Sequence, residues 1–279
     1  MKNAVRLYTY LTLLFIFIYS ISGMLTGIGS EVARVLAFAL PTGIGLVAAR
    51  RLHRLREEEA GTAIHDGTYL GFRGRDALSL LPLVMPVIAT VFLISYLTSL
   101  LLTLVGAENT TVPDAPIIEM LLLHAVLPTI LEEMLFRYLP LKLIAPYSGR
   151  WCIILSSLYF ALIHMNAYQI PYALFAGLVF ITLDLMAGSV WPSVILHLLN
   201  NTVSVFFIKY GADETFVLWF IISMAALAVL SLIPVVIRRR HYLDGICRAA
   251  DPGETLTERR SPMLLTLFCL AMAVLKLFN

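Results

Sequence analysis

The sequence predicts an all-α fold, a polytopic membrane helical bundle with eight or nine transmembrane helices. Of the 279 residues, 59% are hydrophobic and only 14% are charged, whereas an average soluble domain carries about 25% charged residues. Apolar runs long enough to cross a bilayer recur along the whole chain. Because lipid offers no water to the backbone groups of an open sheet edge, we expect these runs to be helices.

The expected spans follow one another with mostly short connections. They cover about residues 5–23, 31–49, 78–105, 116–140, 151–165, 170–187, 190–209, 215–237 and 262–278. The last run is short and could lie in the membrane interface instead, which is why the count is eight or nine. No repeat divides the chain, so we treat it as one membrane domain with three parts. These are N-terminal helices and a cytoplasmic loop at 1–115, a core at 116–210 and C-terminal helices at 211–279.

Basic residues gather in alternate loops. Lys2 and Arg6 precede the first span, six arginines lie between Arg50 and Arg75, and Lys142 and Arg150 follow the span 116–140. The intervening loops lack Lys and Arg. Since basic loops stay on the cytoplasmic side, the pattern predicts a multi-pass protein with a cytoplasmic N-terminus. The net charge of +2 is too small to indicate a nucleic-acid partner.

Three ionisable residues lie inside an otherwise apolar span. A charge at the bilayer centre costs at least about 2.5–3.5 kcal/mol, yet Glu132, Glu133 and Arg137 follow one another here. Glu133 and Arg137 are one helical turn apart, in the favourable acid-first order. An ion pair between them would let Arg137 reach the cytoplasmic interface. Glu132 points about 100° away from Glu133 around the helix, so it lacks this explanation and suits a general acid or base.

Two later spans add polar side chains that suit hydrolysis. His164 lies near the end of the span 151–165, and His197 and Asn201 share one helix face because they are four residues apart. A lone histidine in an apolar helix is usually a hydrogen-bonded core residue, and polar pairs often hold membrane helices together. With Glu132, however, these residues supply a base for activating water and donors for an oxyanion, which are the groups that amide hydrolysis needs.

Helix geometry adds two expectations. Pro128 lies one turn before Glu132 and removes a backbone donor, so we expect a kink there. At ~1.5 Å per residue, His164 lies ~20 Å from the cytoplasmic end of its span, deeper than Glu132. The two residues can meet only if the span 151–165 begins later or if a helix tilts or breaks.

Other intramembrane protease chemistries lack their motifs. The chain contains no H-E-x-x-H zinc helix and no G-x-S-x-G nucleophile turn. Asp184 is the only aspartate within an expected span, so a two-aspartate site has no second member.

Three motifs occur in a fixed order: E-E-x-x-x-R at 132–137, F-x-x-x-H at 160–164 and H-x-x-x-N at 197–201. With them the sequence resembles the CPBP intramembrane proteases, the family of the type II CAAX prenyl endopeptidase and of the bacterial Abi and bacteriocin-immunity proteins. The resemblance covers about residues 116–210, and all three motifs are complete.

The resemblance implies a role for each residue. Glu132, assisted by His164, would activate the water that attacks the scissile carbonyl. His197 and Asn201 would form the oxyanion hole. The supporting residues that would orient the site are Glu133 and Arg137. The family's site opens toward the cytoplasm, in agreement with the basic loop after the span 116–140.

A metal remains an alternative. Glu132, His164 and His197 would make a His₂Glu set, the ligand set of some catalytic zinc sites, with Asn201 as the oxyanion donor. We favour a site without a cofactor, because His197 and Asn201 together suit an oxyanion hole and because no base remains if Glu132 binds zinc.

The expected function is an intramembrane endopeptidase. It would cut a peptide or membrane-protein substrate near the cytoplasmic side of a prokaryotic cell membrane, with the lipid bilayer as its surroundings. The alternatives are a zinc-dependent metalloendopeptidase that uses the same residues, a non-catalytic immunity or scaffold protein of the same fold, and a proton-coupled transporter that uses Glu132 and Asp184.

Overall fold

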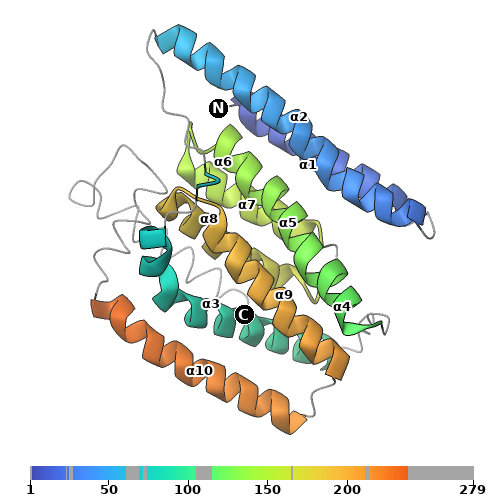
Figure 1. The fold of residues 1–279 in the computed structure, drawn as a ribbon, viewed down its shortest axis with the longest axis vertical. Helices are drawn as coiled ribbons and strands as arrows, with labels where there is room; N and C mark the ends of the chain where they lie inside the picture. Colours follow the sequence, from blue (N-terminus) through green and yellow to red (C-terminus); the bar gives the residue numbers. More distant parts are fainter. Residues whose placement is uncertain are drawn as a thin grey trace.

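In the computed structural model, the described part of the chain is a bundle of helices (Figure 1). The structure describes residues 2–22, 24, 28–60, 69–71, 74–104, 115–164, 166–210 and 214–237. Its elements are α1 (Lys2–Ser22), α2 (Ile28–Ala60), α3 (Gly74–Leu104), α4 (Ile117–Met120), η1 (Leu121–Val126), α5 (Leu127–Glu133), η2 (Met134–Tyr138), α6 (Leu139–Leu143), α7 (Gly149–Leu162), α8 (Ile170–Ala187), α9 (Trp191–Tyr210) and α10 (Glu214–Ile237). The predicted all-α membrane fold is confirmed.

Helices occupy the expected spans from 5–23 to 215–237. Five of the described helices are long and apolar enough to cross a membrane, namely α1, α2, α3, α8 and α9. The segment 262–278 lies outside the described residues. The count of eight or nine spans and the division into three parts therefore stay predictions.

The helices that carry the predicted site residues lie in the middle of the bundle. Figure 1 shows α1 and α2 as an antiparallel pair along one edge, and α10 with α3 along the opposite edge. Between them, α5 packs against α2 and α9, and α7 packs along α8. The three motifs, which lie far apart in the sequence, thus belong to helices that are neighbours in space.

The contact between α7 and α8 depends on a glycine. A Cβ atom at Gly177 would lie 2.9 Å from the Cα atom of Ser157, closer than side chains approach a backbone. Gly177 therefore lets the two helix backbones approach closely. This contact fixes the α7 motif against α8.

The helix that carries the Glu pair is interrupted twice by π-helical turns, η1 and η2. In each case a backbone N–H donates to the carbonyl five residues earlier: Leu127 to Leu122, and Leu139 to Met134. Pro128 and Pro140 follow directly, and neither has an N–H to continue an α-helical ladder. At Pro128, where the sequence predicted a kink, the structure thus has a π-helical turn just before the proline. Such turns are often found at functional sites.

The structure brings Glu132 and His164 to one cavity despite the predicted difference in their depth. α7 begins at Gly149, so the explanation that the span 151–165 begins later is wrong. The helix already ends at Leu162, and His164 lies in the turn that leads to α8. From this turn the side chain contacts the carbonyl of Phe160 and lines the same cavity as Glu132.

Candidate active site

A cavity of about 290 Å³ lies between α1, α2, η1, α5 and the helices α7 to α9. Glu132, His164, His197 and Asn201 all line it. The sequence therefore predicted correctly that these four side chains meet. The other lining residues are Phe15, Tyr19, Phe38, His124, Pro128, Phe160, Ile163, Gln169, Tyr172, Ala173, Ala176, Phe180 and Asn200.

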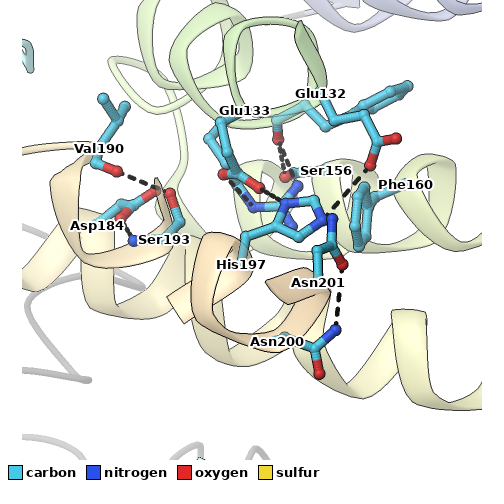
Figure 2. A network of polar contacts seen from close by, with 12 residues as sticks. Glu132, Glu133, Ser156, Phe160, Asp184, Val190, Ser193, His197, Asn200 and Asn201 are labelled. Carbon is cyan, nitrogen blue, oxygen red and sulfur yellow. Dashed lines mark hydrogen bonds and ion pairs between the residues drawn. The ribbon is translucent and has the colours of Figure 1, made fainter. Parts of the chain in front are cut away.

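His197 lies between the two adjacent glutamates (Figure 2). Its Nδ1 is 2.7 Å from Oε1 of Glu133, and its Nε2 is 3.7 Å from Oε2 of Glu132. Neighbouring residues of a helix diverge by about 100°, and the two ring nitrogens lie on different edges of the imidazole. One histidine can therefore face both carboxylates at once.

Glu133 and Arg137 form the predicted ion pair, with Arg137 Nε 3.5 Å from Glu133 Oε2. The expectation that Arg137 reaches the cytoplasmic interface is wrong, because this side chain is fully buried. Its guanidinium lies over the ring of Phe160, 4.3 Å from the centroid, and 5.7 Å from that of Phe180. These cation–π contacts replace water around the charge.

Glu132 differs from Glu133 in its surroundings. Its side chain keeps 15% of its surface exposed, against 2% for Glu133. In both residues Oε2 is buried without a hydrogen-bond partner, but Oε1 of Glu133 is bonded to His197. The distance of 3.7 Å from Glu132 to His197 is longer than a hydrogen bond. Of the two carboxylates, only Glu132 lines the cavity, where its oxygen can accept a proton from a bound water.

His164 is oriented by its own helix. Its Nδ1 lies 2.8 Å from the carbonyl oxygen of Phe160, and its ring meets that of Phe160 edge to face. A carbonyl can only accept, so Nδ1 carries the proton of this bond. The neutral imidazole then has its acceptor at Nε2. His164 can therefore accept a hydrogen bond from water in the cavity.

Asn201 presents a donor to the same space. Its Oδ1 accepts from Nδ2 of Asn200 at 3.3 Å (Figure 2). With the oxygen engaged in this way, the remaining polar group of the Asn201 side chain is its NH₂. Asn200 also lines the cavity.

Several lining residues were missed from the sequence. Three residues spaced four apart on the interrupted helix line the cavity, namely His124, Pro128 and Glu132. This spacing could have identified His124 from the sequence. Phe15 and Phe38 come from α1 and α2 and carry no motif. Nothing in the sequence places these two aromatic residues beside the Glu pair.

Asp184 is fully buried but does not line the cavity. Its Oδ1 accepts the backbone N–H of Ser193 at 3.0 Å, at the start of α9. The transporter alternative placed Asp184 with Glu132, but the cavity contains only Glu132 of that pair. The bond to Ser193 gives Asp184 a structural role at the beginning of the helix that carries His197.

Among the residues that the structure describes, no group of three or more His, Cys, Asp or Glu side chains is arranged to hold a metal ion. Glu132, His164 and His197 share the cavity without forming such a donor cluster. The mechanism proposed below therefore includes no step through a metal.

Comparison with known proteins bears on the core of the chain. Residues 114–203 match the family model of the Rce1-like type II CAAX prenyl endopeptidases. The matched segment contains every residue of the three motifs. No curated protein and no solved structure matches the chain. Residues 114–203 thus match the family that the three motifs predicted, which supports the CAAX-protease assignment of this segment.

Proposed function

We propose that the protein is an intramembrane endopeptidase of the CAAX-protease type, which hydrolyses a peptide bond within the cavity. The observation that carries the proposal is that Glu132, His164, His197 and Asn201, from three separate helical segments, line one cavity. The family match to a type II CAAX prenyl endopeptidase supports the same reaction class.

The first step is the activation of water. A water held between Glu132 and Nε2 of His164 gives a proton to the Glu132 carboxylate. At the same time the oxygen of this water attacks the carbon of the scissile carbonyl. The new carbon–oxygen bond forms as the carbonyl π bond opens to an oxyanion. When the intermediate collapses, the carbon–nitrogen bond breaks and Glu132 returns the proton to the leaving amine.

The second requirement is stabilisation of the oxyanion. The NH₂ group of Asn201 and Nε2–H of His197 are the donors. Glu133 is paired with Arg137 and accepts the Nδ1 proton of His197, so an Nε2–H donor requires the doubly protonated imidazolium.

One wall of the cavity suits an apolar substrate side chain. Phe15, Tyr19 and Phe38 form an aromatic wall contributed by α1 and α2. The volume of about 290 Å³ is at the lower limit of the ~300–1,000 Å³ range of ligand pockets. It therefore accommodates the residues next to the scissile bond but not a long chain segment.

We place the N-terminus in the cytoplasm of a prokaryotic cell. Arg56 donates to the carbonyl of Pro146 at 3.3 Å and lies over Tyr147, so the basic end of α2 meets the turn before α7. At ~1.5 Å per residue along their helices, His197 lies roughly 9 Å and His164 roughly 20 Å from this basic end. Labelling of Arg150→Cys in intact cells by a membrane-impermeant maleimide would refute this orientation.

The function is tested with the purified full-length protein in nanodiscs. The probes are quenched fluorescent reporter peptides, one set with a prenylated CAAX C-terminus and one set unmodified and apolar. We expect the wild type to cleave at least one set and Glu132→Gln to cleave none. Glu119→Gln is the matched control, because Glu119 lies exposed on the same interrupted helix outside the cavity. Equal cleavage by Glu132→Gln and wild type would refute the mechanism.

A further inference from the structure

The carbonyl of Phe136 is freed from its helix by Pro140. In an α-helix this carbonyl would accept from the N–H four residues later, and proline has none. Two side chains donate to it instead: the hydroxyl of Ser156, on α7, and Nη1 of Arg137 at 3.2 Å. Ser156, Arg137 and Phe136 are fully buried. A backbone acceptor created by a proline thus connects α7 to the guanidinium of Arg137.

From Arg137 the contacts continue to the cavity. Nε of Arg137 lies 3.5 Å from Oε2 of Glu133, and Oε1 of Glu133 lies 2.7 Å from Nδ1 of His197. Figure 2 shows the side chains of Ser156, Glu133 and His197 gathered in one region. Neither Ser156, Glu133 nor Arg137 lines the cavity itself, and the hydrogen bond that joins Glu133 to the cavity goes to His197.

We propose that Ser156 is a positioning residue for His197, acting through the Phe136 carbonyl, Arg137 and Glu133. This inference rests on the proposed function, in which His197 stabilises the oxyanion. The Ser156 hydroxyl fixes the carbonyl that orients the guanidinium, and the guanidinium fixes the carboxylate that holds the imidazole. Without the hydroxyl, Arg137 alone donates to the carbonyl, and the position of the imidazole relative to Asn201 is less restricted.

The chain contains a matched control in the next residue. Ser157 is also fully buried, but its hydroxyl donates to the carbonyl of Ile153 in its own helix at 2.6 Å. Ser157→Ala therefore removes a buried hydroxyl from the same helix without touching the path to His197. A loss caused only by poorer packing or folding would affect both alanine variants alike.

The kinetic test compares folded, full-length variants on whichever reporter the wild type cleaves. Ser156→Ala should lower kcat about 10-fold, the effect of one lost hydrogen bond that acts in the transition state, with KM within about twofold. Ser156→Cys keeps the side-chain volume and weakens the donor, so it should lower kcat as Ser156→Ala does. It replaces the alanine variant in the test if the alanine variant folds poorly. Ser156→Thr, which keeps the hydroxyl, should restore kcat, and Ser157→Ala should match the wild type.

Coupling provides a second criterion. If Ser156 acts through Glu133, Ser156→Ala should cost less than about twofold in a Glu133→Gln background, because contacts of one network are not additive. A full 10-fold loss in that background would overturn the proposed path. An equal loss of kcat in Ser156→Ala and Ser157→Ala would overturn the positioning role.

A spectroscopic readout separates failure of this inference from failure of the proposed function. In protein labelled with ¹⁵N-histidine, the His197 signals are assigned by their absence in His197→Gln. The Nδ1 signal should move in Ser156→Ala and Ser156→Cys and stay in place in Ser157→Ala, whether or not any reporter is cleaved. An unchanged Nδ1 signal in both Ser156 variants would overturn the inference even if Glu132→Gln abolishes cleavage.

Discussion

His197 is bonded to Glu133, not to Glu132: Nδ1 lies 2.7 Å from Oε1 of Glu133, while Nε2 remains 3.7 Å from Oε2 of Glu132. The two adjacent carboxylates thus have different surroundings. Glu133 is buried between a guanidinium and an imidazole, whereas Glu132 lines the cavity. The pair separates into one group that holds the site and one group that can react.

This difference predicts different outcomes for the same substitution. Glu133→Gln keeps an acceptor for His197 but leaves Arg137 as a buried cation without its carboxylate. Loss of one partner of a buried pair destabilises a protein by about 3–5 kcal/mol, so we expect a clearly lower unfolding temperature and a partial loss of activity, about 10- to 100-fold. Glu132→Gln should abolish activity with little change in unfolding temperature. Scanning fluorimetry and the reporter assay on both variants check this, and the opposite pattern would exchange the two roles.

Asn201 is predicted to act in the transition state. Asn201→Ala should lower kcat about 10²-fold or more, as loss of an oxyanion donor does, with a smaller effect on KM. Asn200→Ala is the comparison, because Asn200 lines the same cavity and donates to Asn201; a loss of about 10-fold or less is expected if its role is to orient Asn201. Steady-state kinetics on the two variants make the comparison. Equal rates for Asn201→Ala and wild type would remove the oxyanion role.

Metal dependence is checked directly. Because no described group of three donor side chains is arranged around one point, we expect full cleavage after dialysis against a strong chelator such as EDTA. Elemental analysis of the same sample should find no stoichiometric zinc. Activity that disappears with the chelator and returns with added Zn²⁺ would favour the metalloendopeptidase, with Glu132, His164 and His197 as ligands.

The convergence of the four site residues could be predicted because each one stands out against an apolar background. A charged or amide side chain in a membrane span is costly, so it indicates function and partners. The periodicity of the helices also places His197 and Asn201 on one face. Local geometry gives only the shared face; the convergence itself was predicted from the joint occurrence of the three motifs, and it agrees with the cavity lining.

What the sequence could not predict depends on contacts between distant segments. The ion pair of Glu133 with Arg137 follows from their spacing, but the bond of Glu133 to His197 joins residues 64 positions apart. Likewise, Pro140 predicts a free carbonyl at Phe136, but the identity of its donor, Ser156, depends on how α7 packs. The aromatic wall from α1 and α2 has no signal, because apolar residues are ordinary in a membrane helix.

That aromatic wall predicts substrate selectivity. Phe38 lines the cavity and its ring packs on Phe15, 4.6 Å between centroids. Phe38→Ala should enlarge the cavity, so that reporters with a bulky aromatic residue beside the scissile bond gain relative to those with a small one. A change of about 10-fold or more in the ratio of kcat/KM values is expected, since even one methylene group in an apolar pocket discriminates by ~1–3 kcal/mol. Phe206→Ala, on an exposed face of α9, is the control and should leave the ratio unchanged. If both variants keep the wild-type ratio, Phe38 does not contact the substrate, and selectivity must be set by the α8 wall of Tyr172, Ala176 and Phe180 instead.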